Sequence, residues 1–319
     1  MNTAPPALTV CVLDDFQGIA RERLEAAGLP DSVTLNVSPR HLTGGDLLDF
    51  LTPAHIVVAM RERTPLPRDL LQKLPHLQLV ITTGMANAVI DPPEGVALSG
   101  TRIHPHPVTE LTWALIFGLT KNLVTENRNI RTGQWQTTLG RSLHGATLGL
   151  VGVGNAGSAI ASVARELGMT ANGWSPNLTP ERAADAGVTF VSREELFSTS
   201  TIVSLHLRLG PTTEGLITRD DIARMRPDSL FINTSRAELV DYAALVDALR
   251  DGRIAGAGLD VFPEEPTTDS QQDLVTMGNV LATPHIGFVT EDNYDMFFDD
   301  IADNLRGWYA GEHRRPIGG

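Results

Sequence analysis

An arginine, a glutamate and a histidine follow three successive predicted strands in the second half of the sequence. The side chains are those of Arg236, Glu265 and His285, and the strands are predicted at residues 229–233, 254–261 and 280–283. Because ligands of open α/β sheets bind beyond the carboxyl ends of the strands, we expect the three side chains to lie at one edge of a sheet. A guanidinium binds carboxylates, and an imidazole gives or takes a proton near neutral pH. The three residues therefore predict acid–base chemistry on a substrate that carries a carboxylate.

A glycine-rich turn in the same half of the chain predicts the cofactor. Residues 152–157 match G-x-G-x-x-G and lie between an apolar run at 147–151 and a helical pattern at 159–167. In such a strand-to-helix turn, glycines allow a tight bend, close approach of a pyrophosphate and close packing of helix on strand. The positive end of the helix dipole then faces the phosphates. We expect five residues to bind a dinucleotide: Gly152, Gly154, Asn155, Ala156 and Gly157.

Together these residues suit the reduction of a 2-keto acid by a nicotinamide. Arg236 can hold the carboxylate and polarise the keto group, and His285 can supply the proton for the oxygen. Glu265, bonded to the other ring nitrogen, can fix the tautomer and favour the imidazolium. The nicotinamide carries the hydride chemistry, so no metal site is predicted.

The pattern of strands and helices predicts the domains that position these groups. Strands alternate with helices in both halves of the chain, which is typical of parallel sheets with helices on both faces. We therefore predict an α/β protein with two doubly wound parallel-sheet domains. The cofactor domain is a Rossmann domain at residues 105–290, inserted into a domain made of residues 1–104 and 291–319. The two crossings between the domains predict a hinge with a cleft.

Two long helical patterns flank the cofactor domain. Residues 108–129 are apolar nearly all round, which predicts one helix buried between domains or against another subunit. Residues 290–319 predict an amphipathic helix that packs back on the N-terminal domain. We expect its acidic residues to form a solvated face: Glu291, Asp292, Asp295, Asp299, Asp300 and Asp303.

The composition of the chain limits its expected compartment and binding partners. The net charge of −13 argues against a nucleic-acid-binding or anionic-membrane surface. No apolar run reaches about 20 residues and no basic segment precedes the first apolar stretch, so we expect neither a membrane span nor an export signal. The single cysteine, Cys11, suits a reducing compartment, and we predict a cytoplasmic protein.

Three segments resemble the signatures of the D-isomer-specific 2-hydroxyacid dehydrogenases. They are residues 232–236 (INTSR) with 239–241 (LVD), 258–266 (GLDVFPEEP) and 283–287 (TPHIG). The resemblance implies Arg236 as the substrate-binding residue, with His285 as acid/base and Glu265 as its partner. It also implies that Asp260 contacts the nicotinamide carboxamide and that the cofactor meets His206 and Thr234.

The same resemblance implies an assembly and a fold for the other domain. The first and last parts of the chain would form a flavodoxin-like substrate domain. Subunits would pair as a homodimer through the cofactor domain, a role that the predicted helix at 108–129 fits.

The sequence departs from the family pattern at three places. Ser175 stands where an acidic residue usually binds the adenosine ribose, which permits NADP, yet the nearest cation is Arg182 beside an acid, so we favour NAD. Arg208 replaces a common proline. Phe288 replaces a small residue next to the histidine, and we expect its ring to narrow the substrate pocket or lengthen its wall.

Two segments of the first domain are candidates for substrate contact. Arg61 or Arg63 could meet a second anionic group of the substrate, with a solvated charged loop as the equal alternative. Gly84 and Met85 lie in the segment that matches the substrate loop of the family, and its backbone amides are expected to bind the substrate carboxylate.

Two alternatives to this function stay open. A phosphite dehydrogenase would use similar chemistry, whereas a formate dehydrogenase is disfavoured because Glu265 stands where a glutamine would assist the histidine. A corepressor-like NAD(H)-sensing scaffold would bind NADH but reduce keto acids very slowly. The absence of a long flexible tail or basic surface argues against that scaffold.

Overall fold

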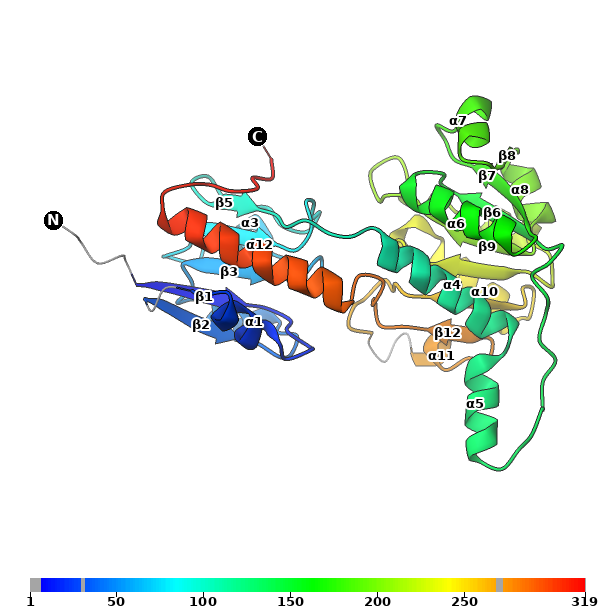
Figure 1. Ribbon diagram of the computed structural model, residues 1–319, viewed down its shortest axis with the longest axis horizontal. Coiled ribbons are helices and arrows are strands. Elements are labelled where there is room, and N and C mark those ends of the chain that lie inside the picture. Colours follow the sequence, from blue (N-terminus) through cyan, green and yellow to red (C-terminus); the bar gives the residue numbers. More distant parts are fainter. Residues whose placement is uncertain (1–6, 30–31, 268–271, 319) are drawn as a thin grey trace. The chain divides into compact units, whose positions relative to one another are not determined.

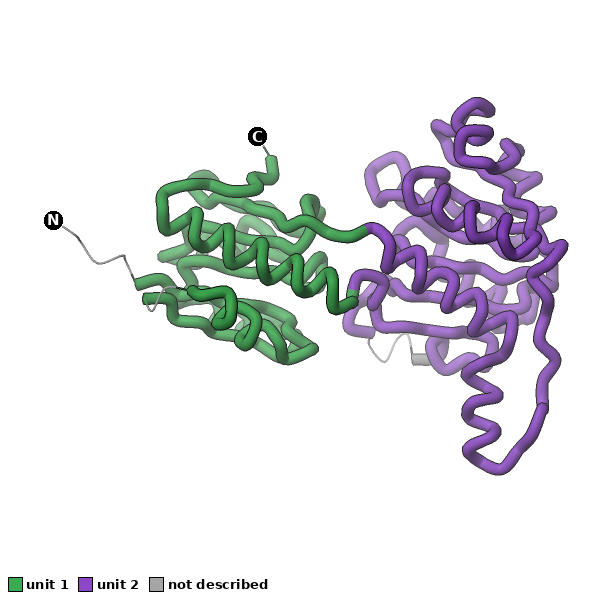
Figure 2. Tube along the Cα trace, in the orientation of Figure 1, with its two compact units in different colours: residues 1–104, 289–319 green, residues 105–288 purple. Residues whose placement is uncertain are grey.

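The computed structural model describes residues 7–29, 32–267 and 272–318. The chain forms two compact units (Figure 2), and each is described by itself. Unit 1 comprises Met1–His104 and Val289–Gly319, and unit 2 comprises Pro105–Phe288. Within the described part of the chain, no helix has the length and apolar character needed to cross a membrane.

Unit 1 is built on a parallel five-stranded sheet with the strand order β2-β1-β3-β4-β5. This order is that of flavodoxin-like folds. The strands are β1 (Leu8–Val12), β2 (Val33–Val37), β3 (Ile56–Ala59), β4 (Leu79–Thr82) and β5 (Ala97–Ser99). The helices are α1 (Ala20–Ala26), α2 (Gly44–Leu51), α3 (Arg68–Leu71) and α12 (Glu291–Tyr309).

Helix α12 lies along α1 in unit 1 (Figure 1). Its apolar face, with Phe297, Ile301 and Leu305, is fully buried, as the sequence predicts. The prediction that the acidic residues of this helix are solvated is wrong for Asp300, which is only 1% exposed. The Arg102 guanidinium lies 2.8 Å from its carboxylate and the Arg315 guanidinium lies 2.9 Å away, and the backbone N–H of Arg102 also donates to it. These two arginines supply the charge that allows Asp300 to be buried.

Unit 2 is built on a parallel seven-stranded sheet with the strand order β12-β11-β10-β9-β6-β7-β8. The strands are β6 (Thr147–Val151), β7 (Thr170–Trp174), β8 (Thr189–Phe190), β9 (Ile202–Leu205), β10 (Leu230–Asn233), β11 (Gly256–Leu259) and β12 (Val280–Ala282). Counted in chain order within unit 2, neighbours run 3-2-1-4-5-6-7, which extends the Rossmann order. The order reverses between β6 and β9, so the crevice for a dinucleotide lies at their carboxyl ends.

Helices cover both faces of this sheet. They are α4 (His106–Thr120), α5 (Leu123–Arg131), α6 (Asn155–Glu166), α7 (Pro180–Asp185), α8 (Arg193–Thr199), α9 (Arg219–Arg224), α10 (Tyr242–Arg250) and α11 (Gln272–Val275), with a 3₁₀ turn, η1 (Ala237–Leu239). Asp241 caps α10 by accepting from the backbone N–H of Ala244 (2.9 Å), and Gly252 follows that helix with φ of 64°. These start and stop signals were predicted and are confirmed.

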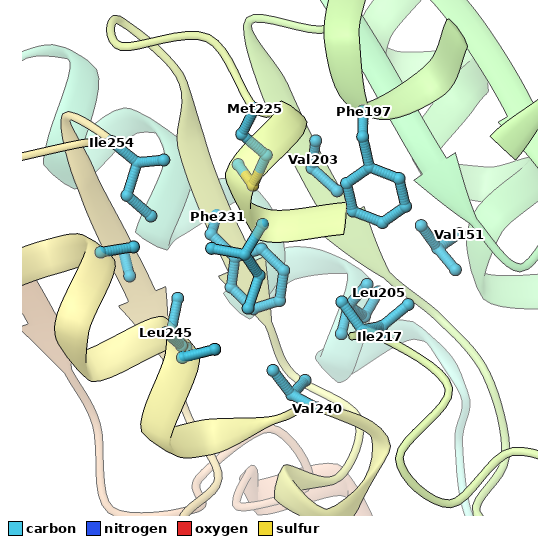
Figure 3. Close-up of a cluster of buried hydrophobic side chains, with 14 of the residues drawn as sticks. Val151, Phe197, Val203, Leu205, Ile217, Met225, Phe231, Val240, Leu245 and Ile254 are labelled. Carbon is cyan, nitrogen blue, oxygen red and sulfur yellow. The ribbon is translucent and has the colours of Figure 1, made fainter. Parts of the chain in front are cut away.

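The strands of unit 2 divide their side chains between two apolar cores. Phe231 points into one core with Val203 and Leu205 (Figure 3), whereas its neighbour Ile232 belongs to the core on the other face with Ile202. This division follows from the two-residue repeat of a strand whose two faces are both covered by helices.

The predicted single helix at 108–129 is two helices. Asn122 adopts a left-handed conformation, with φ of 52°, and separates α4 from α5. Helix α4 packs on α6 and on strands β10, β11 and β12 of its own unit, which explains its apolar surface. Helix α5 is different, because Leu123 and Val124 are exposed. Figure 1 shows α5 and the chain after it projecting from the body of unit 2.

Candidate active site

The three glycines of the turn after β6 meet different surroundings. A Cβ on Gly152, whose φ is 102°, would lie 2.6 Å from the carbonyl oxygen of His206. A Cβ on Gly157 would lie 2.2 Å from the carbonyl oxygen of Gly152. Both glycines are therefore required by the fold itself. A Cβ on Gly154 would meet nothing within 4 Å, so the space beside it is open to a ligand.

The residues after Gly154 start a helix whose first turn faces outward. Gly154 caps α6 without a side-chain hydrogen bond, and Asn155 is exposed beside it. The N–H groups of a first helical turn have no partners inside the helix and attract anions. The open space at Gly154 and the N-terminus of α6 both suit the pyrophosphate of a dinucleotide. The backbone N–H groups of Gly154, Asn155 and Ala156 would bind that pyrophosphate.

His206 lies at the point where the strand order reverses. Its backbone N–H donates to the carbonyl of Val151 (2.8 Å), and its Nε2 lies 2.8 Å from the hydroxyl of Ser204. Burial lowers the pKa of His206 to about 3. The ring is therefore neutral near pH 7. The predicted contact of His206 with the cofactor is compatible with this position at the carboxyl end of β9.

Ser175 lies directly after β7, where the predicted ribose contact belongs. The nearby Arg182 donates from Nη1 to the carbonyl of Asn177 (2.9 Å). A second cation, Arg193, stacks on the ring of Trp174, with its guanidinium carbon 5.1 Å from the centroid. It also forms an ion pair with the buried carboxylate of Asp221. The charge of Arg193 is therefore already balanced inside the unit.

The loop after β10 is held by a buried asparagine. The side chain of Asn233 donates to the carbonyl of Arg236 (2.9 Å) and accepts from the N–H of Ser235 (3.0 Å). The Ser235 hydroxyl donates to the carbonyl of Leu205 (2.7 Å), which ties the loop to β9. Sequence reasoning selected Arg236 but missed Asn233, whose signal was a polar residue at the end of an apolar strand.

Thr234 faces the first helix of unit 2. Its hydroxyl lies 2.9 Å from that of Thr112 on α4, and both side chains are buried. The Arg236 guanidinium donates to the carbonyl of Ser235 (2.7 Å). The loop after β10 is therefore held on both sides of Ser235. These contacts fix the backbone position from which the Arg236 side chain extends.

Glu265 and His285 are in direct contact. Nδ1 of His285 lies 2.5 Å from Oε2 of Glu265, and the backbone N–H of Phe262 donates to Oε1 (2.8 Å). Each carboxylate oxygen thus has its own donor. Because the carboxylate accepts a hydrogen bond, Nδ1 carries a proton, and Nε2 is the nitrogen that can exchange one. The predicted pairing of these two side chains is present.

Asp260 holds the turn that carries His285. The Thr283 hydroxyl (2.6 Å) and the backbone N–H of Ile286 (2.8 Å) donate to Oδ1, and the N–H of Gly287 (2.8 Å) donates to Oδ2. Burial raises the pKa of Asp260, although these hydrogen bonds oppose the effect. His285 has a φ of 51°, a region that non-glycine residues rarely occupy. This positioning by Asp260 was missed, because the sequence indicates only that the two segments lie on adjacent strands.

Phe288 packs against the histidine. The two rings meet edge to face, with centroids 5.6 Å apart, and Phe288 is 7% exposed. We expected the ring to shape a substrate pocket. The ring therefore packs on His285 within unit 2, and its expected effect on the substrate pocket stays a prediction.

In unit 1, Arg61 and Gly84 lie side by side at the carboxyl ends of β3 and β4. The Arg61 guanidinium donates to the carbonyl of Thr83 (3.1 Å) and lies 3.5 Å from the Glu62 carboxylate. The N–H of Gly84 donates to the hydroxyl of Thr101 (2.8 Å). Met85 is exposed next to it. The hydrogen bond to Thr101 uses the one amide proton that Gly84 could offer a substrate.

Arg63 is integrated into a polar cluster of unit 1. It donates to the carbonyl of Asp14 (2.9 Å) and stacks over Phe16 at 4.7 Å. The buried Asp14 carboxylate accepts from the Thr64 hydroxyl (2.6 Å) and lies 3.0 Å from Nδ1 of His41. Of the two arginines considered for a second anion, Arg63 thus has a structural role in unit 1.

Comparison with known proteins places unit 2 in a family. A family model described as "D-isomer specific 2-hydroxyacid dehydrogenase, NAD binding domain" matches residues 113–287. The chain belongs to the D-isomer specific 2-hydroxyacid dehydrogenase family. Unit 2 is accordingly its NAD-binding domain, in agreement with the Rossmann strand order and the glycine turn.

Relatives in this family match both units. The chain is 35% identical over 240 residues to D-3-phosphoglycerate dehydrogenase of Bacillus subtilis, covering 73% of this chain and 45% of that protein. It is 33% identical over 259 residues to glyoxylate reductase of Thermococcus litoralis, covering 77% and 78%. The crystal structure of a phosphoglycerate oxidoreductase from Vibrio cholerae O395 superposes with a TM-score of 0.88 at 32% identity, covering 95% of this chain and 99% of that one. The chain spans about half the length of the phosphoglycerate dehydrogenases it matches.

Proposed function

We propose that the chain is an NAD-dependent dehydrogenase that interconverts a D-2-hydroxy acid and a 2-keto acid. The observation that carries this proposal is the 2.5 Å contact between His285 and Glu265. It lies in the same unit as the dinucleotide turn, and both are at the carboxyl edge of one sheet. A histidine held by a carboxylate at that edge suits proton exchange with a substrate bound near a dinucleotide.

Each residue of the pair has a separate task in this proposal. When bound, NADH would supply the hydride for the keto carbon, and His285 would donate the proton for the oxygen from Nε2. Glu265 keeps the proton on Nδ1 and favours the imidazolium that reduction requires. Asp260 fixes the backbone turn of His285, and its predicted contact with the nicotinamide carboxamide would be an additional acceptor role.

Arg236 is proposed to bind the substrate carboxylate. Its planar fork suits a bidentate carboxylate contact, and the Asn233 side chain fixes the loop from which it extends. The second group of substrate contacts is proposed at Arg61 and the Gly84–Met85 segment of unit 1. Because the N–H of Gly84 is donated to Thr101, we place any backbone contact of that segment at Met85.

The proposed cofactor preference is NAD over NADP. Ser175 would bond a ribose hydroxyl, and a 2′-phosphate would need a cation beside it. Arg193 is balanced by Asp221, and Arg182 bonds the carbonyl of Asn177. Both arrangements favour a ribose without the extra phosphate.

A homodimer through unit 2 is also proposed. The exposed apolar side chains of α5 and of the loop at 132–142 support it: Leu123, Val124, Ile130, Trp135 and Leu139. We refer to α5 and the loop at 132–142 as the arm of unit 2. The proposed interface uses this arm and not α4, because α4 packs against its own unit.

Oxidation of NADH and NADPH with a panel of 2-keto acids tests the proposal. The panel holds glyoxylate, hydroxypyruvate, pyruvate, 2-ketobutyrate, phenylpyruvate and 3-phosphohydroxypyruvate, and His285→Asn is the control. We expect NADH-dependent turnover with at least one acid, reduced by about two to four orders of magnitude in the variant. Tight NADH binding without turnover on any acid would contradict the dehydrogenase and favour a sensing scaffold.

A further inference from the structure

A tyrosine in the unit that holds the acid–base pair has a buried hydroxyl group without a hydrogen-bond partner. Tyr242 is the first residue of α10, and its hydroxyl meets no donor or acceptor among the described residues. Buried polar groups are nearly always bonded, and an unmatched one lowers stability. Such an exception in a native structure calls for a cause.

One member of the acid–base pair carries a charge that acts on this hydroxyl. The Glu265 carboxylate interacts electrostatically with the Tyr242 phenol. The Tyr242 ring packs against the apolar core that contains Phe262, and the backbone N–H of Phe262 donates to Glu265. The tyrosine and the carboxylate are thus anchored on the same part of unit 2.

The two groups also complement each other chemically. Among the described residues, hydrogen bonds reach Glu265 from Phe262 and His285, one to each oxygen. A carboxylate offers about four lone-pair sites, so it can accept a further bond. Burial and the charge of Glu265 raise the pKa of Tyr242, so the phenol keeps its proton and is a donor throughout the working pH range.

We propose that Tyr242 is a positioning residue whose hydroxyl donates to Glu265 when His285 has given up its Nε2 proton. This inference rests on the proposed function of the pair. While His285 is an imidazolium, its positive charge balances the carboxylate. After proton transfer the ring is neutral, and the carboxylate charge needs another donor. The hydroxyl then supplies that donor, with no change in its own protonation.

The sign of the effect follows from this charge balance. Donation from Tyr242 favours the state with neutral His285 and charged Glu265. Removing the hydroxyl therefore favours the imidazolium up to higher pH. Asp260 also interacts electrostatically with His285, and the substitution leaves it in place. The neighbouring rings of Phe262 and Phe288 carry no charge.

The test is Tyr242→Phe, which keeps the ring and removes the hydroxyl. We expect the midpoint of the pH–rate profile for keto-acid reduction to rise by about half to one pH unit, the effect of one lost hydrogen bond to a charged group. In a Glu265→Gln background the same substitution should cause no shift. Superimposable profiles of the parent and Tyr242→Phe would overturn the proposal.

Tyr294→Phe is the matched control. Tyr294 donates to the side-chain oxygen of Gln17 (2.7 Å), so its loss removes a satisfied hydrogen bond within unit 1. We expect this control to lower thermal stability without moving the pH–rate midpoint. Tyr242→Phe should move the midpoint and leave thermal stability equal or higher. A midpoint that moves equally in both variants would count against a specific role of Tyr242.

A second readout works without a known substrate. The Cε1–H resonance of His285, assigned by its loss in His285→Asn, can be titrated by NMR in the full chain. Its titration midpoint should rise in Tyr242→Phe, even if no tested acid is turned over. An unchanged midpoint together with normal turnover would overturn this inference alone. Absent turnover together with a shifted midpoint would instead count against the proposed function.

Discussion

The ring of Phe288 lies edge-on to the imidazole of His285, with an angle of 82° between the two planes. Glu265 binds Nδ1 of the same imidazole. The histidine is thus held by an apolar ring and by a carboxylate. Both contacts lie within unit 2, and both limit the rotation of the side chain that is proposed to deliver the proton.

Phe288→Leu should lower kcat by up to about tenfold, because an edge-to-face aromatic contact is worth about 0.5–1.5 kcal/mol. The binding constant for NADH should stay unchanged, since the glycine turn is not altered. Steady-state kinetics and NADH fluorescence titration measure the two quantities. Phe190→Leu, at the exposed ring of β8, is the matched control and should leave kcat unaltered. An equal fall of kcat in both variants would argue against a role of Phe288 in orienting His285.

Arg236→Gln should raise KM for the keto acid by about a hundredfold, because hydrogen bonds between charged groups are worth about 1.5–3 kcal/mol. NADH affinity should remain within about twofold, since the hydrogen bonds from Asn233 still hold the loop in the variant. Arg226→Gln provides the control, because Arg226 forms an exposed ion pair with Asp228. Equal losses of keto-acid and NADH binding in Arg236→Gln would show that the residue supports the loop instead of the substrate.

Gly154→Ala and Gly157→Ala should have opposite effects. A methyl group at Gly154 meets no protein atom within 4 Å, so folding should be unaffected, whereas NADH affinity should fall by about tenfold or more as the pyrophosphate is crowded. A methyl group at Gly157 would lie 2.2 Å from a backbone oxygen, so thermal stability should fall first. Thermal melts and NADH titrations separate the two. Normal NADH binding by folded Gly154→Ala would remove the proposed pyrophosphate contact.

Asp221 makes stability depend on pH. Burial raises the pKa of its carboxyl, but hydrogen bonds from Arg193 and Thr218 outweigh burial and hold that pKa below its usual range. The unfolded chain therefore takes up this proton first, at about pH 4, and the stabilisation is complete above that value. It is lost as the pH falls further, through the folded-state pKa.

Asp221→Asn should accordingly lower the free energy of unfolding at pH 7 by about 1–3 kcal/mol. The variant should lose less stability than the parent between pH 5 and 3. Urea unfolding at several pH values measures both. Asp247→Asn, in an exposed ion pair with Arg219, is the control and should change stability little. Parallel acid-side curves for the parent and Asp221→Asn would disprove the assigned contribution.

Sequence patterns predicted the parts of this protein that follow local rules. The turn at Gly152, the cap at Asp241 and the side chains after each strand depend on periodicity and spacing, which are visible in one sequence. The contact of His285 with Glu265 could be predicted because parallel strands bring their carboxyl ends to one edge.

The missed features depend on contacts between distant segments. Asp260 supports the turn of His285 through backbone N–H groups, which no side-chain pattern reveals. Asp300 is buried because Arg102 and Arg315, far apart in the chain, both reach it. The break between α4 and α5 arises from one left-handed residue, Asn122, inside a pattern that reads as helical throughout.

The arm of unit 2 has an ordered base and an apolar surface. Glu126 on α5 accepts from the backbone N–H of Thr138 (2.7 Å) and from the Thr137 hydroxyl (2.9 Å), which ties the following loop to the helix. Leu139 is nevertheless 95% exposed and Trp135 is 73% exposed. Such preorganised apolar side chains lose little conformational entropy when a second copy covers them.

The double substitution Trp135→Ser with Leu139→Asp should therefore convert a dimer into a monomer of 34.4 kDa. The reason is that the contact area would lose its largest apolar anchors and gain a buried charge. Light scattering coupled to size-exclusion chromatography measures the mass across a range of concentrations. Leu209→Asp, at another exposed leucine of unit 2, should leave the dimer intact. A parent protein that is monomeric at every concentration would refute the homodimer. A double variant that stays dimeric while the parent is dimeric would move the interface away from this arm.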